Sequence, residues 1–240
     1  MCRLKRNSFA RLWVVVLLFL GSATALAQTN IIFDTDFGGD ADDLGALVML
    51  NHFQNKGEIE LLAVQCWNTE KYAVQAIDAV NTHYGNPDIP IGLRKGEIHE
   101  TAWNHSKVLV DSLTHDLVVK EVPETTALYR KLLSDAEDQS IVIVTVGPLL
   151  NIKRLIDSAP DEFSTLNGKE LILKKVKEFV IMGGQFPEGE QEWNFSGDMP
   201  GVTRYVLQNL ENPVTFLGYE VGVDLKTGEV FNDLPKSSPL

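Results

Sequence analysis

Along most of the chain, apolar runs of strand length alternate with longer segments whose apolar residues recur at helical spacing. The runs at 31–34, 60–65, 141–146, 179–183 and 214–217 predict strands, and the segments at 42–54, 70–84, 125–136, 148–157 and 201–210 predict helices. Several runs are apolar at consecutive positions, which is typical of strands covered on both faces. The alternation predicts an α/β fold with a doubly wound, mostly parallel sheet flanked by helices. Residues 95–123 are less regular, and either a lid over a site or a surface loop with a short helix fits them.

The first 27 residues follow a separate pattern. Four basic residues precede or border an apolar stretch at 12–20, and the small residues Ala25 and Ala27 follow it. This pattern predicts a secretory signal peptide over residues 1–27, and the stretch is too short to favour a membrane anchor. We therefore expect an exported protein, periplasmic or extracellular, whose mature chain runs from 28 to 240 and has no part in a membrane.

The mature chain is strongly acidic. Without the four basic side chains of the signal peptide, 17 basic and 33 acidic side chains remain, a formal charge of −16. Such a charge repels phosphate backbones, so we exclude nucleic acid as a partner. Only Cys66 remains of the two cysteines, so no disulfide can form within the mature chain. About 210 residues of this hydrophobic content predict one domain with a buried core.

A cluster of carboxylates follows the first expected strand and leads into the first expected helix. Its five members lie within ten residues: Asp34, Asp36, Asp40, Asp42 and Asp43. Like charges at this spacing repel each other, so the folded chain needs a cation or hydrogen-bond donors to compensate them. Capping of the helix accounts for one or two acids, but not for five. Because ligands bind beyond the carboxyl ends of strands in open parallel sheets, the cluster predicts a site for a hard cation such as Ca²⁺ or Mg²⁺.

Two known carboxylate patterns can be compared with this cluster. In an EF-hand beginning at Asp34, the twelfth position requires a bidentate Glu, and this chain has Gly45 there. The D-x-D pattern of a metal-dependent phosphatase would make Asp34 the nucleophile and Asp36 the acid/base group. That scheme leaves the other three aspartates without a role, but it stays open as an alternative.

Four short motifs occur in order along the mature chain. The segment DTDFGGDADD at 34–43 is followed by TVGPLLN at 145–151, MGG at 182–184 and EWN at 192–194. They are similar to the DTDxGxDxDD, TGxLTN, MGG and E-[FY]-N motifs of one enzyme family, and together they cover nearly all of the mature chain. By these motifs the chain resembles the inosine-uridine-preferring nucleoside hydrolase family.

The resemblance implies an enzyme that hydrolyses the N-glycosidic bond of ribonucleosides to nucleobase and ribose, with a Ca²⁺ ion clamping the ribose hydroxyls. It implies that Asp36 and Asp43 bind the metal, with the backbone carbonyl of Val146 as a further ligand. Asp42 would be the general base acting on a metal-bound water. Carboxylates suit this reaction because the transition state resembles an oxocarbenium ion, whose positive charge they stabilise.

The resemblance also implies a set of sugar-binding residues. Glu192 and Asn194 lie two positions apart on a segment that we expect to be extended, so both can face the sugar. Asn68 follows the second strand and is a candidate for the family's ribose-binding asparagine, although alignment through residues 70–71 places Cys66 there instead. Trp193 is a candidate to line the sugar pocket.

Other roles stay open. Trp67 and Trp103 are candidates to stack on the base, but packing explains an aromatic residue equally well. No histidine has a motif that identifies it as the acid that protonates the leaving base. The resemblance also suggests dimers or tetramers.

The chain departs from the family pattern near its C-terminus. The family continues beyond the point equivalent to Leu240 into a helical region with a late metal-binding Asp, and neither Asp224 nor Asp233 has the surrounding pattern. We therefore expect this chain to lack the C-terminal part of the domain. A non-catalytic nucleoside- or sugar-binding protein on a truncated hydrolase fold is the remaining alternative.

Overall fold

The computed structural model describes residues 28–98, 100, 105–189, 191–197, 199–225 and 233. The predicted signal peptide over residues 1–27 lies outside the described residues, as do His99 and Trp103. Within the described residues, the structure has no helix whose length and hydrophobicity would let it cross a membrane.

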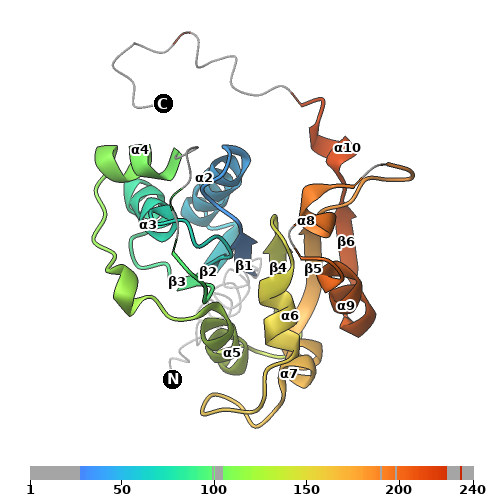
Figure 1. Cartoon of the computed structure of the whole chain (residues 1–240). Helices are drawn as coiled ribbons and strands as arrows, with labels where there is room; N and C mark the ends of the chain where they lie inside the picture. Colours follow the sequence, from blue (N-terminus) through green and yellow to red (C-terminus); the bar gives the residue numbers. More distant parts are fainter. Residues whose placement is uncertain are drawn as a thin grey trace, which may run out of the picture.

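A six-stranded sheet forms the centre of the structure, in the order β3-β2-β1-β4-β5-β6 (Figure 1). Its strands are β1 (Thr29–Thr35), β2 (Ile59–Cys66), β3 (Ile91–Leu93), β4 (Ile141–Thr145), β5 (Val176–Met182) and β6 (Val214–Leu217). All five neighbouring pairs are parallel. The chain builds outward from β1 to β3, then returns to the other side of β1 for β4. This reversal confirms the predicted doubly wound α/β fold and creates a switch point between β1 and β4.

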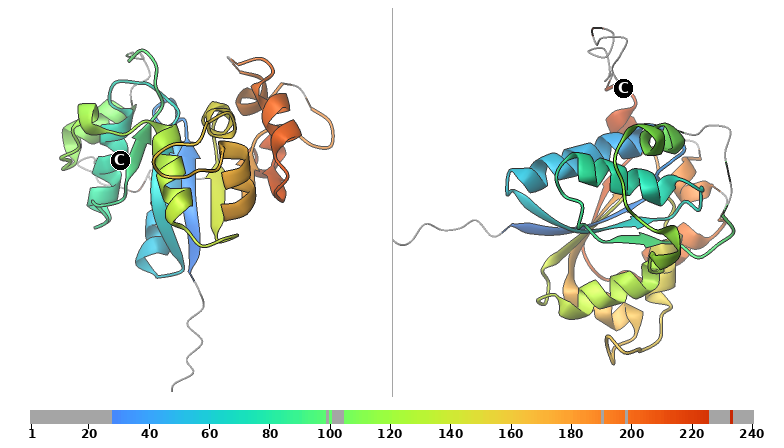
Figure 2. Two further views of the ribbon diagram at one scale, coloured as in Figure 1. Left: turned by 90° about the horizontal axis from the view of Figure 1, so that it is seen from below. Right: turned by 90° about the vertical axis from the view of Figure 1, so that its left-hand side faces the viewer.

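Helices cover both faces of the sheet (Figure 2). They are α2 (Asp42–Asn55), α3 (Ala73–His83), α4 (His105–Ser112), α5 (Thr125–Asp135), α6 (Leu150–Ile156), α7 (Gly168–Lys175), α8 (Trp193–Ser196), α9 (Val202–Asn209) and α10 (Tyr219–Gly222), with a 3-10 turn at Val119–Glu121. The side chains of β1 alternate between two cores: Ile31 and Phe33 pack with α2 and α3, whereas Ile32 packs with α5, α6 and α7. A strand that is apolar on both faces therefore has a core on each side, as the apolar runs predict.

The five predicted strands and five predicted helices are present, with shifted ends. The helix predicted from residue 70 begins at Ala73, because the carboxylate of Glu70 accepts the N–H of Tyr72 in a local turn. Strand β3 has no counterpart in the prediction, since three residues are too few for a periodic pattern. Helix α7 is also additional, and a capping box between Asn167 and Glu170 marks its start.

The irregular region at 95–123 contains α4 and the 3-10 turn. Leu109 of α4 is buried in the core that α2 and α3 share. This arrangement agrees with the expected loop with a short helix.

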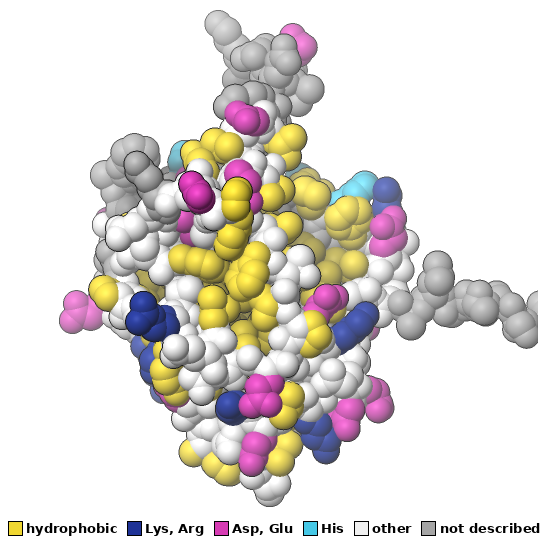
Figure 3. All heavy atoms as spheres, turned by 90° about the vertical axis from the view of Figure 1, so that its right-hand side faces the viewer, with side chains coloured by type: hydrophobic (Ala, Val, Ile, Leu, Met, Phe, Trp, Pro, Cys, Tyr) yellow, Lys and Arg dark blue, Asp and Glu magenta, His cyan; other side chains and the backbone are white. Residues whose placement is uncertain are grey.

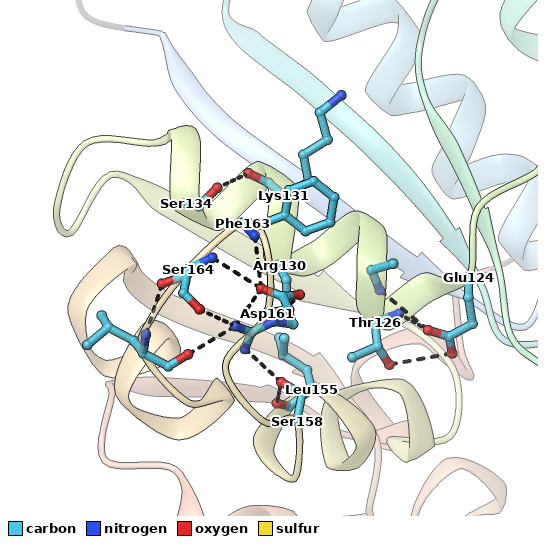
Figure 4. A network of polar contacts seen from close by, with 12 residues as sticks. Glu124, Thr126, Arg130, Lys131, Ser134, Leu155, Ser158, Asp161, Phe163 and Ser164 are labelled. Atoms are coloured by element: carbon cyan, nitrogen blue, oxygen red, sulfur yellow. Dashed lines mark hydrogen bonds and ion pairs between the residues drawn. The ribbon is translucent and has the colours of Figure 1, made fainter.

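A buried arginine fixes the loop between α6 and α7 (Figure 4). Arg130 of α5 is 2% exposed and forms a two-pronged ion pair with Asp161, with N–O distances of 2.6 and 2.9 Å. Its remaining donors contact the hydroxyl of Ser158 at 3.0 Å and the carbonyls of Ser164 and Leu166 at 3.1 and 3.0 Å. One guanidinium therefore holds both ends of the loop against α5.

We expect Arg130→Met to lower the free energy of unfolding by about 3 kcal/mol, because it leaves a carboxylate and two carbonyls without their donor. The matched control is Lys107→Met, which removes the Lys107–Asp111 pair, whose side chains are 49% and 58% exposed. That change should cost less than about 0.5 kcal/mol. Urea denaturation measures both variants, and equal losses would show that the buried loop contacts add nothing.

Candidate metal and nucleoside site

The acidic loop lies at the switch point of the sheet. It follows β1, and its base is tied to both neighbouring strands: the N–H of Val146, after β4, donates to the carbonyl of Asp34 at 2.9 Å. The N–H of Trp67, after β2, donates to the carbonyl of Thr35 at 2.8 Å. The carboxyl ends of three adjacent parallel strands therefore hold the loop, as the sequence predicts.

The five aspartates lie at different depths. Asp34 and Asp43 are buried, Asp36 is partly buried, and Asp40 and Asp42 are exposed. One carboxylate oxygen from each of Asp40, Asp42 and Asp43 lies within 4.8 Å of the others. Asp40, which has no predicted role, is thus part of the closest group of potential oxygen ligands.

Asp36 lies against the turn that follows β4. A Cβ atom placed on Gly147 would approach its Oδ1 to 2.6 Å and its backbone nitrogen to 2.9 Å. Only glycine leaves this space, so Gly147 lets the acidic loop approach the backbone next to Val146. Val146 and Asp36 therefore line the same cavity.

Asp34 is the buried foundation of the loop. It is 1% exposed and accepts hydrogen bonds from the hydroxyl of Tyr129 at 2.8 Å and from the amide of Asn151 at 3.2 Å. The hydroxyl of Thr125 in turn donates to Asn151 at 3.2 Å. A phosphatase nucleophile must reach its substrate, so this burial argues against the D-x-D alternative.

The local electrostatics favour bound positive charge. Burial, with a smaller contribution from Asp36, raises the pKa of Asp34 to about 7. Burial also raises the pKa of Asp36 to about 7 and that of Asp43 well above its usual range, and neighbouring carboxylates add to both. The pKa of Asp40 rises to about 6 through partial desolvation of its carboxylate and through Asp42, while His105 of α4 partly offsets this rise. Carboxylate and carbonyl oxygens are the donors that Ca²⁺ prefers, so the residues present fit such an ion.

A cavity of about 410 Å³ opens above the loop. Five predicted site residues line it: Asp36, Asp42, Val146, Glu192 and Asn194. Asp43 lies beneath, where its carboxylate accepts a hydrogen bond from the hydroxyl of Thr35 at 2.5 Å. The cavity is also lined by Asp40, Met182, Gln185, Gln191 and Tyr219, together with Trp193, the candidate for the sugar pocket.

The segment around Glu192 is not extended, so that expectation is wrong. Residues Trp193–Ser196 form the short helix α8, and Glu192 is its N-cap. The Glu192 carboxylate accepts the N–H groups of Asn194 at 2.8 Å, Phe195 at 3.2 Å and Gly184 at 2.7 Å. A capping carboxylate satisfies donors that a helix start leaves free, and here it also joins α8 to the end of β5.

Asn194 and Asn68 both contact the backbone of the site. The amide of Asn194 donates to the carbonyl of Val146 at 2.9 Å, so it orients the predicted metal-ligand oxygen, which has a second lone pair. The amide of Asn68 donates to the carbonyl of Asp36 at 3.2 Å, and Asn68 is not among the residues that line the cavity. Cys66 is fully buried.

Sequence comparison identifies the family. A model described as inosine-uridine preferring nucleoside hydrolase matches residues 31–237. The chain belongs to this family. This confirms the resemblance that the four motifs indicate. A comparison with curated proteins gave no match.

Three solved structures resemble this member of the nucleoside hydrolase family. The effector protein XOO4466 has a TM-score of 0.62 at 16% identity, and the match covers 89% of this chain and 61% of that one. A plant nucleoside hydrolase, the PpNRh1 enzyme, has a TM-score of 0.57 at 17% identity, with 80% and 60% covered. An inosine-guanosine nucleoside hydrolase has a TM-score of 0.54 at 20% identity, with 81% and 62% covered. This chain therefore spans about three fifths of the length of these structures, and the likeness establishes the fold.

We expect Tyr129→Phe to lower the free energy of unfolding by about 1–3 kcal/mol, because buried Asp34 then loses a donor while the ring still fills its space. The control is Tyr205→Phe, which removes a hydroxyl bonded to Asp157 at the surface. That variant should stay within about 0.5 kcal/mol of the parent. Chemical denaturation measures both, and a Tyr129→Phe variant as stable as the parent would contradict the role given to this bond.

Proposed function

We propose that the protein hydrolyses the N-glycosidic bond of ribonucleosides, releasing a nucleobase and ribose, with Ca²⁺ as its cofactor. The observation that carries this proposal is the single cavity lined by Asp36, Asp42, Val146, Glu192 and Asn194 at the switch point of the sheet. These residues are spread over positions 36 to 194, yet the fold brings them to one place. Family membership supports the same reaction.

The donors of the acidic loop would hold the ion. Asp36, Asp43 and the carbonyl of Val146 are the ligands that the resemblance implies, and the position of Asp40 next to Asp42 and Asp43 makes it a further donor. When bound, Ca²⁺ would fix the ribose hydroxyls and make the attacking water more acidic. Burial and the hydrogen bond from the hydroxyl of Thr35 hold the Asp43 side chain in place beneath the ion, so the site needs little rearrangement.

Asp42 is exposed to the cavity and would accept a proton from the attacking water. The water oxygen forms a bond to C1′ of the ribose, and the bond from C1′ to the base nitrogen breaks with its electron pair leaving on the base. Positive charge develops on the sugar ring in this transition state, and the surrounding carboxylates stabilise it. Asn194 would keep the carbonyl of Val146 oriented toward the site.

Incubation with inosine, uridine and a nitrophenyl riboside, with and without a chelator, tests the proposal. We expect ribose release that stops with the chelator and returns on addition of Ca²⁺. Asp42→Asn should lower kcat by about 10²- to 10⁴-fold and leave Ca²⁺ binding intact. Asp43→Asn should abolish Ca²⁺ binding in calorimetry, and the exposed control Asp116→Asn should change neither quantity.

The outcomes separate the alternatives. Ca²⁺ binding without cleavage of any substrate would overturn the catalytic proposal and favour a non-catalytic nucleoside- or sugar-binding protein. Cleavage that persists with the chelator would overturn the cofactor. Phosphate release lost in Asp34→Asn would instead support the phosphatase.

We also propose that the chain is exported, because residues 1–27 have the basic, apolar and small-residue order of a signal peptide. Mass spectrometry of the protein isolated from its native cells should find a mature chain that begins at Gln28. An intact chain beginning at Met1 in the cytosolic fraction would contradict export.

A further inference from the structure

Charge is distributed unevenly over the surface. The face that includes β6 and α10 has a hydrophobic centre, with basic and acidic side chains around its margin (Figure 3). At the opposite edge of the sheet, the consecutive basic residues Arg94 and Lys95 directly follow β3. Arg154 of α6 extends to the same place, where its Nη1 donates to the carbonyl of Lys95 at 3.2 Å. Basic residues therefore gather at one edge of a chain that is strongly acidic as a whole.

The guanidinium of Arg94 is held in a fixed direction with most of its donors unused. The backbone N–H of Arg94 donates to the carbonyl of Cys66 at 2.9 Å, and its Nε donates to the carbonyl of Trp67 at 2.5 Å. The guanidinium carbon lies 4.5 Å from the centroid of the Trp67 ring. Among the described residues, no acceptor contacts its Nη1 or Nη2 groups. A Cβ atom placed on Gly96 would lie 3.3 Å from Nη1, so the glycine leaves this side of the guanidinium uncrowded.

The positive charges at this edge are poorly compensated. Burial and the nearby charge of Arg154 lower the pKa of Arg94, yet a guanidinium stays protonated at neutral pH. In the part of the chain that the structure describes, Arg94 has no carboxylate within ion-pair distance, and Glu124 lies 3.7 Å from Arg154. Glu124 is also the N-cap of α5, where it accepts the N–H of Thr126 at 2.7 Å. One carboxylate, shared with a helix start, therefore faces two guanidiniums.

A neutral donor without a partner lies beside them. The indole Nε1 of Trp67 is buried, and it has no hydrogen-bond partner within the described ranges. The backbone N–H of Trp67 donates to the carbonyl of Thr35 at 2.8 Å, which ties the residue to the sheet. A buried donor costs free energy unless a ligand or a water accepts from it. Charged and neutral donors thus outnumber the acceptors at this edge.

We propose that Arg94, Arg154 and the indole of Trp67 bind a phosphate oxyanion. A carboxylate can satisfy a single guanidinium fork, whereas a phosphate has further oxygens and can pair with both guanidiniums at once. Inorganic phosphate and the phosphate monoester of a sugar both offer this group. None of the three residues lines the cavity of the aspartates, so the site is separate from that of the proposed hydrolase reaction.

Calorimetric titration of the full mature chain tests the site, without added Ca²⁺ because Ca²⁺ precipitates phosphate. The ligands are inorganic phosphate and ribose 5-phosphate, and the controls are ribose, acetate and NaCl of equal ionic strength. We expect both phosphates to bind and the controls to give no saturable binding. The tighter of the two phosphates shows whether the site prefers the free ion or a monoester.

Substitutions of the two arginines test the assignment. Arg94→Gln and Arg154→Gln should each weaken phosphate binding by about 10- to 100-fold, because each removes hydrogen bonds between opposite charges. The matched control Arg204→Gln removes an exposed arginine of α9 and should change the affinity by less than about twofold. Circular dichroism shows whether each variant is folded. If Arg94→Gln does not fold, Arg154→Gln decides, because the side chain of Arg154 is 34% exposed.

Tryptophan fluorescence locates the bound anion. Phosphate next to Arg94 should change the emission of Trp67, so the change should disappear in Trp67→Phe and persist in Trp193→Phe. Trp67→Phe keeps an aromatic ring beside Arg94 and removes a neutral donor, so its phosphate affinity should fall by only about 2- to 10-fold.

Because these measurements need no turnover, they do not depend on whether the protein cleaves nucleosides. A parent chain that binds neither phosphate would overturn the site, as would parental affinity in both Arg94→Gln and Arg154→Gln. Equal weakening in Arg154→Gln and Arg204→Gln, or a fluorescence change that persists in Trp67→Phe, would place the anion elsewhere and overturn it as well. Acetate that binds as tightly as phosphate would overturn the assignment of the ligand class.

Discussion

The pairing of β1 with both β2 and β4 is the constraint on which the rest of the structure depends. Because these pairs are parallel, the carboxyl ends of three strands meet at one edge, and the loop after β1 must leave the sheet between its neighbours. The backbone bonds from Val146 and Trp67 to this loop follow directly from that register. Charged side chains on such a loop cannot move apart as they would on a flexible segment. The sheet therefore keeps the carboxylates close enough to repel each other.

The fold offsets part of this repulsion with hydrogen-bond donors to the buried members of the cluster. The phenol of Tyr129 and the amide of Asn151 serve Asp34, and the hydroxyl of Thr35 serves Asp43. These donors are neutral, so they stabilise the carboxylates without removing the net negative charge. The cavity therefore remains a place where a cation lowers the free energy, and the buried members of the cluster keep its ligands preorganised.

The sequence predicts the strands that are apolar over several positions and the residues that directly follow them. Asp36, Asp42 and Val146 are found together because Asp36 and Val146 directly follow recognisable strands and Asp42 begins the helix after the first of these strands. The depth of each aspartate could not be predicted, since the burial of Asp34 depends on partners 95 and 117 positions away. The capping role of Glu192 could not be predicted either, because a four-residue helix has no periodic pattern. Tyr219 follows a four-residue strand and belongs to none of the four motifs, so the structure is needed to identify it as a residue of the cavity.

The two halves of the sheet contribute differently to the site. The half around β1 is covered on both faces, and it supplies charged groups whose effect on a transition state depends on fixed positions. The half ending in β6 is less covered, with Phe216 and Leu217 38% and 41% exposed. It supplies one wall of the cavity, whose aromatic and amide side chains are those of Trp193, Tyr219, Gln185, Gln191 and Asn194. Local hydrogen bonds hold this less covered half together. The carboxylate of Glu192 accepts the N–H of Gly184 and so joins α8 to the end of β5, and the carbonyl of Gly184 accepts the N–H of Tyr219. Gly184 thus links the two parts of the wall, and its φ of 76° lies in the region that glycine adopts most readily. A side chain at this position would strain the backbone that holds Glu192 and Tyr219 together, although Gly184 is not among the residues that line the cavity.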